Sequence, residues 1–429
     1  MHNKLKILII GGGAREHAVG WKVAQSQRSG EIFFAPGNAG TMQIGTNVDI
    51  NATDIPKLLD FVKREHIDLT LALPDDPLSL GIVDEFEKAG LRIWGPTKAA
   101  SQLEWSKAFA KNFMAHYKLP TAEFRTFTDI ATAKNYLLRQ KYPVVIKASG
   151  LALGKGVVIA ESKEEAHEFL EDLMVKKIFG DSGTEVVIEE FLSGVEISIH
   201  ALCDGNNYKI FPPSQDHKRI NDGDMGPNTG GMGVIGPLPF ITNDIMDRIE
   251  REVIAPTLVA MKESGIPFKG ILYPSIMLTE DGPKIIEFNA RFGDPEAEVY
   301  MRLLDSDLLE MFEASIDGKL SEIEIRWKNL FACNIALASA GYPGDYKKGK
   351  EIKGIDEAEL NQKVVVFHAG TKIKDNELVS SGGRVLGVSA TGGDLQGALD
   401  NAYSAIKKIN FDGMQYRKDI GQKALKLGK

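Results

Sequence analysis

The chain has 429 residues, of which 43% are hydrophobic and 26% are charged; these values are those of a globular protein, and the length predicts roughly two to four domains. A formal net charge of −8 argues against broad binding to nucleic acid or to an anionic membrane, and no apolar run approaches the about 18 residues of a transmembrane helix. The only cysteines, Cys203 and Cys333, exclude a disulfide framework and a zinc motif and indicate a reducing compartment.

Residues 1–102 alternate short apolar strands with helical segments. The first expected strand, Leu5–Ile10, runs directly into three glycines, which is typical of an opening β-strand and not of a signal peptide. The other segments expected here are strands at Glu31–Ala35, Leu69–Leu73 and Leu91–Trp94, and helices at Arg15–Arg28, Asp54–His66 and Leu78–Ala89. This βαβ alternation predicts an open parallel sheet and an α/β fold class for this part.

The rest of the chain mixes helices and strands in the manner of an α+β fold. The segments expected in the middle are helices at Ser106–Tyr117 and Asn243–Ser264, strands at Pro143–Lys147, Gly156–Ala160, Val186–Phe191 and Glu196–Leu202, a long loop at Asp216–Gly236, and a hairpin of Gly270–Leu278 with Lys284–Asn289. From about Trp327, the pattern predicts a separate small β-rich domain, with strands at Phe331–Ala338, Val364–Ala369 and Arg384–Ala390 and a helix near Leu395–Ile409.

Two glycine-rich segments are candidate phosphate sites. The turn Gly11–Arg15 ends the first strand and opens a helix, so its backbone N–H groups suit a phosphate. Glu16 stands where a dinucleotide fingerprint has its third glycine, which favours a single sugar phosphate, although a plain strand–helix turn fits equally well. Gly150–Gly156 lacks the spacing of a Walker A loop. It predicts instead a hairpin over nucleotide phosphates, charged by Lys155 and Lys147, with a flexible surface hairpin as the alternative.

The sharpest constellation lies in Ile285–Asp294. Alternate residues of a strand share a face, so Glu287, Asn289 and Arg291 point together while apolar residues between them point into the core. Carboxylate and amide oxygens suit a Mg²⁺ ion that also holds ATP phosphates, and Arg291 can stabilise a transferring phosphoryl group. The alternative is the polar face of an edge strand, which the apolar residues between them disfavour.

Two further segments carry weaker signals. The adjacent acids Glu189 and Glu190 are most simply a solvated strand edge; the functional alternative is a hinge strand that reads adenine, with Glu196 accepting hydrogen bonds from ribose hydroxyls. The segments Gln215–Arg219 and Gly226–Gly233 are rich in donors and glycine, which favours a substrate-binding loop over a disordered one.

A series of motifs, in chain order, carries a family resemblance: Arg15–Ala18, Pro36–Gly40, Ser106–Phe109, Gly154–Gly156, Gln215–Arg219, Gly226–Gly233, Ile286–Glu296, His368–Thr371, Gly382–Val385 and Arg417–Gly421. With these motifs the chain resembles the ATP-grasp superfamily and, within it, the glycinamide ribonucleotide synthetase family, over nearly its whole length. Gly226–Gly233 and Arg291–Glu296 are the specific parts of this match.

The resemblance implies a Rossmann-like N-terminal domain at 1–102, a two-lobed ATP-grasp domain at 103–326 with a mobile lid lobe at about 121–192, and a small β-rich C-terminal domain at 327–429. It implies that ATP, with Mg²⁺ or Mn²⁺, activates glycine as glycyl phosphate and that 5-phosphoribosylamine then captures it, in de novo purine biosynthesis. It further implies small molecules as the only partners, with no nucleic acid or membrane, and a cytoplasmic monomer whose active site lies between the N-terminal domain and the ATP-grasp lobes.

The motifs and the resemblance together assign roles to individual residues. The expected metal ligands are Glu287 and Asn289, and the expected catalytic residues are Arg291, Lys155 and Asp216. The expected ATP-binding residues are Lys107, Lys147, Gly154, Lys155, Gly156, Glu189, Glu190, Phe191 and Glu196. The expected substrate-binding residues are Gly11, Gly13, Arg15, Glu16, Asn38, Asp216, Lys218, Asn228, Thr229, Gly230 and Asp294.

Departures from the family pattern keep alternatives open. They fall at Ala14, Ser149, Leu153, Asp75–Asp76, Pro274–Ser275 and Ala297–Glu298. Because most surround the expected amine and glycine sites, a related ATP-grasp carboxylate–amine ligase with another acid or amine is the alternative within enzymes. A nucleotide-binding regulator without catalysis is disfavoured by the intact metal and arginine positions, and a Rossmann dehydrogenase by Glu16.

Overall fold

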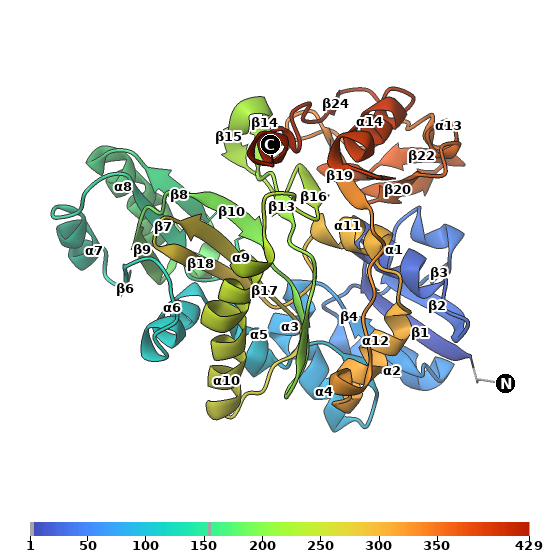
Figure 1. Cartoon of the computed structure of the whole chain (residues 1–429), viewed down its shortest axis with the longest axis horizontal. Helices are drawn as coiled ribbons and strands as arrows, with labels where there is room; N and C mark the ends of the chain where they lie inside the picture. Colours follow the sequence, from blue (N-terminus) through green and yellow to red (C-terminus); the bar gives the residue numbers. More distant parts are fainter. Residues whose placement is uncertain (1–3, 153–155, 429) are drawn as a thin grey trace.

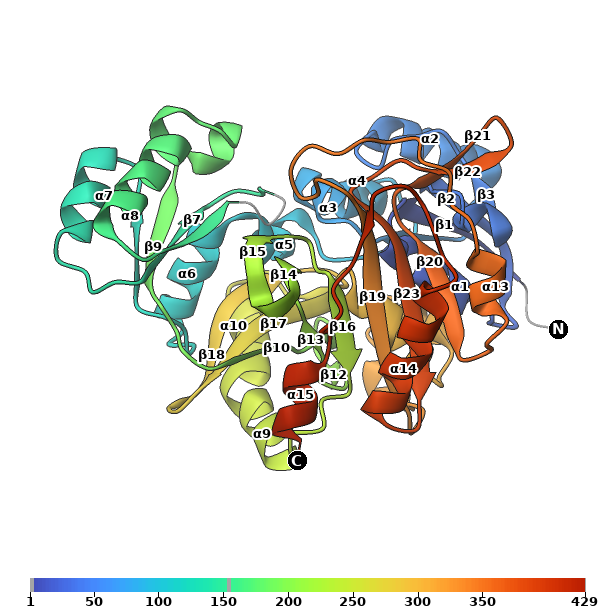
Figure 2. The ribbon, with the colours of Figure 1, turned by 90° about the horizontal axis from the view of Figure 1, so that it is seen from above.

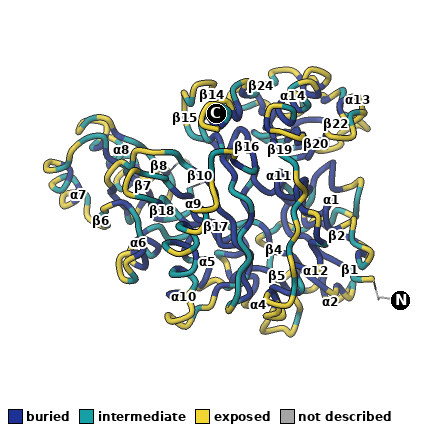
Figure 3. Tube along the Cα trace, in the orientation of Figure 1, coloured by how far each residue is buried: buried dark blue, intermediate teal, exposed yellow. Residues whose placement is uncertain are grey.

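The structure is a computed structural model that describes residues 4–152 and 156–428. Figure 1 shows a long molecule with the N-terminal sheet at one end, a lobe that contains β6 to β9 with α7 and α8 at the other, and the C-terminal strands above the N-terminal sheet. Buried segments run through the central part and the N-terminal sheet, whereas the helices of the outlying lobe are largely exposed at their outer faces (Figure 3). Within the described ranges, no helix has both the length and the apolar character needed to cross a membrane.

The N-terminal part contains a five-stranded parallel sheet in the order β3-β2-β1-β4-β5, which confirms the predicted open parallel sheet. Its elements are β1 (Leu5–Gly11), α1 (Ala14–Val23), β2 (Ser29–Pro36), β3 (Thr46–Asn47), α2 (Ile55–Glu65), β4 (Leu69–Ala72), α3 (Asp75–Leu80), α4 (Ile82–Lys88) and β5 (Ile93–Trp94). The helix expected at Leu78–Ala89 is interrupted, because Gly81 has a φ of +89° and ends α3. The strand order reverses between β1 and β4, where a parallel sheet opens a crevice at its carboxyl edge.

The outlying lobe has a hydrophobic core of its own. Its antiparallel sheet has the order β6-β9-β7-β8, and α7 and α8 pack on it. The elements are β6 (Phe124–Phe127), α7 (Ile130–Leu137), β7 (Val144–Ala148), β8 (Val157–Ala160), α8 (Lys163–Leu170) and β9 (Val186–Glu190). Leu137, Ile146 and Ile188 are buried in a cluster that is separate from the other cores, so the lobe is packed as one unit.

The central sheet has the order β10-β17-β11-β12, with β18 paired to β17. Its elements, with the helices beside it, are α5 (Lys98–Trp105), α6 (Lys107–His116), β10 (Val195–Ser198), β11 (Ala201–Asp204), β12 (Tyr208–Ile210), α9 (Asn243–Ile249), α10 (Ala255–Glu263), β17 (Lys269–Thr279) and β18 (Gly282–Asn289). The predicted hairpin is confirmed as β17–β18. The single strand expected at Glu196–Leu202 is instead two, β10 and β11, separated opposite Tyr273 and Pro274 of β17, where proline lacks a ladder N–H.

The third sheet joins distant segments in the order β13-β16-β19-β23-β20, with β24 beside β19. Its strands are β13 (Gln215–Asp216), β16 (Gly233–Gly236), β19 (Phe331–Ser339), β20 (Val364–His368), β23 (Arg384–Gly392) and β24 (Met414–Gln415). The prediction of a single loop at Asp216–Gly236 is therefore wrong. β13 and β16 are strands at its ends, where β16 pairs with both β13 and β19, and a hairpin of β14 (Arg219–Asn221) and β15 (Met225–Asn228) lies inside it.

Helices cover both faces of the third sheet. α14 (Leu395–Ile406) lies along β19 and β23 (Figure 2), and α11 (Glu296–Leu303) packs on the same strands and also on α1. The remaining elements are α12 (Leu308–Asp317), α13 (Ile355–Glu359), β21 (Thr371–Lys374), β22 (Glu377–Ser380) and α15 (Gln422–Leu427). By touching α1 on one side and β19 on the other, α11 joins the N-terminal part to the C-terminal sheet.

Candidate active site

A cavity of about 1010 Å³ lies where the N-terminal part, the lid lobe, the central sheet and the C-terminal sheet meet. The expected site residues that line it are Gly13, Arg15, Lys107, Lys147, Gly156, Glu189, Glu190, Phe191, Glu196, Asp216, Lys218, Asn228, Thr229, Gly230, Glu287, Asn289, Arg291 and Asp294. Residues of the C-terminal part also contribute to the wall, among them Tyr342, Gly370 and Arg384. Gly154 and Lys155 lie outside the described residues.

The outlying lobe contributes apolar residues and a buried charge cluster beside the cavity. Val145 and Ile159 line the cavity together with Met277 of β17. In the charge cluster, Oε2 of Glu189 lies 3.1 Å from Nζ of Lys147 and 3.2 Å from Nζ of Lys111, and all three residues are buried. The Lys147 ammonium also donates to the carbonyl of Ile286 on β18, which ties the lid sheet to the central sheet.

Lys111 does not line the cavity but pairs with Glu189, which does, and sequence reasoning missed it. Burial, together with the charge of Lys147, lowers its pKa to about 8, while Glu189 opposes that change. Lys111 follows Lys107 by one helical turn on α6, and this i, i+4 spacing is a sequence signal that could have identified it.

The two expected metal ligands on β18, Glu287 and Asn289, lie close to positively charged side chains. Oε1 of Glu287 lies 3.9 Å from Nζ of Lys218, and the same ammonium forms a close ion pair with Glu196. Burial alone would raise the pKa of Glu287, but Lys218, Lys107 and other neighbouring cations lower it to about 2. Glu287 therefore remains ionised, with 28% of its side chain open to the cavity.

Arg291 projects from the end of β18 between two polar partners. Its Nη2 lies 2.9 Å from Oε1 of Glu104 and donates to Oδ1 of Asn289 at 3.2 Å. The carboxylate of Glu104 in turn accepts the N–H of Ala290. Glu104, which sequence reasoning also missed, thus fixes both the backbone and the guanidinium at this corner. The Nε of Arg291 is buried and has no hydrogen-bond partner among the described residues.

Three acids, Asp216, Asp294 and Glu296, also line the cavity. Burial, and then the charge of Glu296, raises the pKa of Asp216 well above its ordinary value. Glu296 accepts hydrogen bonds from the hydroxyls of Tyr273 at 2.6 Å and Ser198 at 3.1 Å. The third acid, Asp294, pairs with Arg384 of β23 at 3.2 Å. These carboxylates form a compact acidic wall that can hold an ammonium group or accept a proton.

Arg384 connects this acidic wall to the glycine-rich loop. Its Nη1 donates to the carbonyl of Gly230 at 2.7 Å and to that of Asp294 at 2.8 Å. The hydroxyl of Tyr342 accepts the N–H of Gly230 at 3.1 Å. The C-terminal part therefore shapes the cavity directly, which the expected location between the N-terminal domain and the ATP-grasp lobes did not include.

Three residues expected at the substrate site, Gly11, Glu16 and Asn38, do not line the cavity. Glu16 is buried and accepts the N–H of Gly13 at 2.7 Å and the Nε–H of Arg15 at 2.6 Å. The carboxylate therefore acts within the turn, and the N–H of Gly13 is already bonded to it.

Asn38 is likewise used within the chain. Its amide nitrogen donates to the carbonyls of Gly12 and His368, and its Oδ1 accepts the N–H groups of Gly40 and Thr41. With its amide engaged on both sides, Asn38 fixes the crevice loop against β20 and leaves the cavity wall to Gly12, Gly13, Arg15 and Asp75.

Comparisons with known proteins give a consistent family. Three models of phosphoribosylglycinamide synthetase match the chain: the N domain at residues 5–104, the ATP-grasp (A) domain at 105–297 and the C domain at 332–423. A phosphoribosylamine–glycine ligase of Chlorobaculum tepidum is 48% identical over 98% of this chain and all of that protein, and one of Caldanaerobacter subterraneus is 47% identical over 97% and 99%.

Comparison with solved structures supports the same family. A phosphoribosylamine–glycine ligase of Thermotoga maritima has a TM-score of 0.86 at 36% identity and covers 97% of this chain and 100% of that one. A biotin carboxylase domain of Hydrogenobacter thermophilus, in complex with MgADP and bicarbonate, has a TM-score of 0.75 at 16% identity over 100% and 99% of the two chains, a likeness that concerns the fold alone. With family models that together span most of its length and relatives near half identity, the chain belongs to the phosphoribosylglycinamide synthetase family.

Proposed function

We propose that this chain joins glycine to 5-phosphoribosylamine at the expense of ATP, giving glycinamide ribonucleotide, ADP and phosphate. The observation that carries the proposal is the single cavity that contains both a cationic cluster around Glu287 and an acidic wall at Asp216, Asp294 and Glu296. The cationic cluster suits polyphosphate, and the acidic wall suits two amines that must meet beside an activated carboxylate.

The nucleotide would bind on the lid side. The apolar side chains of Val145, Ile159 and Met277 suit the base, and Glu196 lies within the wall where it can accept ribose hydroxyls. Lys107 and Lys147 would hold phosphate oxygens. Lid closure over residues 121–192 would then exclude water from the phosphoryl group in transfer.

The donor set on β18 fits a divalent cation. Glu287 is ionised and opens to the cavity, and Asn289 offers an amide oxygen two residues further along the same face. Within the described residues, no group of three or more His, Cys, Asp or Glu side chains could hold a metal, so phosphate and water would complete the shell of Mg²⁺ or Mn²⁺. Such an ion neutralises charge that develops on the phosphates.

The chemistry needs no protein nucleophile. A glycine carboxylate oxygen attacks the γ-phosphorus of ATP and ADP leaves, with Arg291 placed to stabilise the charge on the transferring group. The amine of phosphoribosylamine then attacks the carbonyl carbon of glycyl phosphate, phosphate departs, and the nitrogen loses a proton. Asp216, whose pKa burial raises, is placed to accept that proton.

The remaining proposals concern organisation. We propose the functional division 1–102, 103–326 and 327–429, with the pairing of β16 and β19 tying the second part to the third. We propose that the chain works as a monomer. The two buried free thiols, Cys203 and Cys333, fit the cytoplasm.

Product analysis tests the function. The purified chain is supplied with MgATP, phosphoribosylamine and one amino acid at a time (glycine, alanine or serine), and ADP release and product mass are measured together. We expect ADP and the glycine adduct in equal amounts, and neither product when any one substrate is omitted. ADP release with an adduct of another acid or amine would replace the proposed substrate pair, and a lack of MgATP-dependent product would refute the ligase.

A further inference from the structure

The hairpin β14–β15 overhangs the cavity without belonging to a larger sheet. Among the described residues its strands pair only with each other, around the short 3₁₀ turn η4 (Asp222–Asp224). Lys218, Arg219 and Asp224 of this region line the cavity. A two-stranded ribbon alone is only marginally stable, so contacts outside the ribbon must hold it in place.

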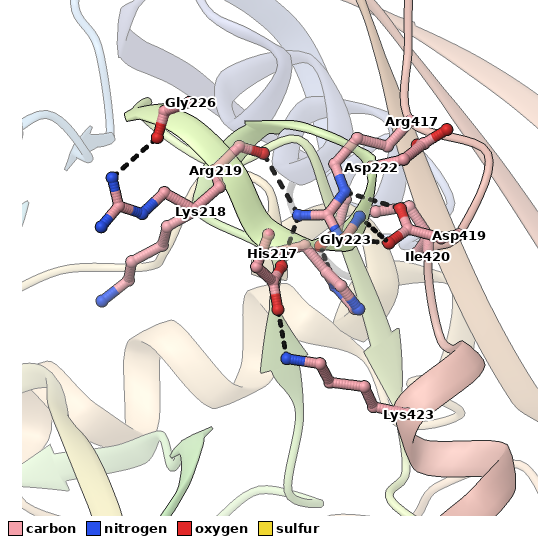
Figure 4. Close-up of polar contacts among 12 residues, drawn as sticks. His217, Lys218, Arg219, Asp222, Gly223, Gly226, Arg417, Asp419, Ile420 and Lys423 are labelled. Carbon is pink, nitrogen blue, oxygen red and sulfur yellow. Dashed lines mark hydrogen bonds and ion pairs between the residues drawn. The ribbon is translucent and has the colours of Figure 1, made fainter. Parts of the chain in front are cut away.

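Arg417, from the segment between β24 and α15, supplies the central contact (Figure 4). Its guanidinium makes a bidentate pair with Asp419 at 2.8 and 2.7 Å, donates to Oδ1 of Asp224 at 2.7 Å, and donates to the carbonyl of Arg219 at 3.2 Å. Only 1% of the Arg417 side chain is exposed. The buried guanidinium of Arg417 thus connects the first strand of the hairpin, the hairpin tip and the C-terminal segment.

Backbone contacts extend the same connection. The N–H of Lys418 donates to Oδ1 of Asp222 at 2.7 Å, and the N–H of Gly223 donates to Oδ2 of Asp419 at 2.8 Å. These two bonds run in opposite directions between the hairpin tip and residues 418–419 (Figure 4). The exposed Lys423 also pairs with Asp224, but two-thirds of its side chain is in solvent and screening makes it a weak partner.

The base of the hairpin is fixed by different residues. The Nε2 of His217 accepts the N–H of Gly421 at 3.1 Å, and its Nδ1 lies 2.9 Å from the carbonyl of Gly233. Past the second strand, Arg384 and Tyr342 hold Gly230. The tip is therefore the part whose position depends on Arg417 and its partners.

Electrostatics strengthen this dependence. Although burial raises the pKa of Asp419, the hydrogen bonds from Arg417 and Gly223 lower it to about 2. Without the guanidinium, Asp419 would be left with the backbone N–H of Gly223 and Asp224 with the exposed Lys423, and the two carboxylates, each about 30% exposed, would repel each other. Breaking one partner of such a buried set is strongly unfavourable, so the tip would move away from Asp419.

The clamp bears on the cavity because Arg417 also holds the carbonyl of Arg219, the residue after Lys218, and Lys218 reaches both Glu196 and Glu287. We propose that Arg417 is a positioning residue: with Asp419 it clamps the tip of the β14–β15 hairpin and so holds Lys218 against the nucleotide end of the cavity. The nucleotide's identity rests on the proposed function, whereas the clamp itself rests on the contacts given above.

The test uses the full chain with Arg417→Met and the milder Asp419→Asn, beside Lys418→Met as the matched control. The control removes the positive charge of Lys418, the residue next to Arg417, and keeps the hydrogen bond from its backbone N–H to Asp222. MgATP affinity is measured by calorimetry, the KM for ATP and kcat by ADP release, and backbone hydrogen exchange over residues 219–228 by mass spectrometry.

In Arg417→Met we expect the Kd and the KM for MgATP to rise about tenfold, kcat to change less than about twofold, and exchange to quicken in residues 219–228 alone. Asp419→Asn should show the same pattern at smaller size, and Lys418→Met should match the wild type. If Arg417→Met does not fold, the affinity and hydrogen exchange of Asp419→Asn decide whether the clamp exists. The clamp is overturned by unchanged exchange and affinity, or by exchange that quickens throughout the chain. If the wild type fails to bind MgATP, the proposed function falls, and the exchange data still decide the clamp.

Discussion

Replacing Glu287 with Gln in the ligand-free protein should lower the free energy of unfolding at neutral pH. The neighbouring cations lower the pKa of this carboxyl from 4.5 to about 2. At about 1.36 kcal/mol per pH unit that lowering corresponds to about 3.4 kcal/mol, and solvent screening of a side chain that is 28% exposed reduces the expected loss to about 2 to 3 kcal/mol.

The pH dependence has a definite sign. Because the folded-state pKa of Glu287 lies below the unfolded value, its contribution is fully present above the unfolded pKa of 4.5 and is lost as the pH falls toward about 2. The difference in unfolding free energy between the wild type and Glu287→Gln should therefore be about 1 kcal/mol smaller at pH 3.5 than at pH 7.

Urea unfolding at both pH values measures this difference. The control is Glu280→Gln, an exposed residue in the turn of the same β17–β18 hairpin, where the change should stay within about 0.5 kcal/mol. At an ATP concentration of 100 times the Kd, MgATP should add about 2.7 kcal/mol to the wild type and much less to Glu287→Gln. A variant as stable as the wild type at pH 7, or a difference that does not shrink in acid, would refute the electrostatic account of this site.

Three further substitutions test a buried acid of α11 and two residues of the cavity wall. Glu298 of α11 is buried, neither of its carboxylate oxygens has a hydrogen-bond partner among the described residues, and burial raises its pKa. Glu298→Gln should therefore raise the Tm, measured by calorimetry, by a few degrees at pH 8 and by far less at pH 5. Equal increases in Tm at the two pH values would contradict the raised pKa. Gly13→Val should raise the KM for phosphoribosylamine and leave that for ATP nearly unchanged, since a Cβ there would lie 2.9 Å from Glu16 and 3.3 Å from Asp294; a parallel rise in both constants would misplace the amine site. Arg384→Lys should lower kcat/KM for the amine at least about tenfold, because a lysine cannot make the same fork of bonds; retention of activity would show that the charge alone suffices.

Sequence patterns predicted what depends on neighbours along the chain. The parallel N-terminal sheet and the β17–β18 hairpin follow from local alternation and turn residues, and both are present. The shared face of Glu287 and Asn289 follows from the two-residue period of a strand, whereas Arg291 lies two residues beyond the end of β18; all three line the cavity.

What the sequence could not predict depends on partners far along the chain. Asn38 stands in a glycine-rich loop of the kind that binds ligands, but its side-chain amide donates a hydrogen bond to the carbonyl of His368, 330 positions away. Arg384 reaches Gly230 and Asp294 across 154 and 90 positions, and although it stands in one of the family motifs, nothing in its neighbours along the chain predicts these partners. β16 has the glycine content of a loop and is a strand only because β19 supplies its hydrogen-bond partners.

The pairing of β16 with β19 also bears on synthesis. β16 leaves the ribosome roughly 95 residues before β19 begins, which at about 5 to 20 residues per second leaves one of its edges without its final neighbour for about 5 to 20 s. During that interval the nascent chain presents an apolar strand edge, the kind of surface that other chains can extend into aggregates. Slower decoding between these two strands would lengthen the exposure, whereas a chaperone that covers Gly233–Gly236 would shorten it.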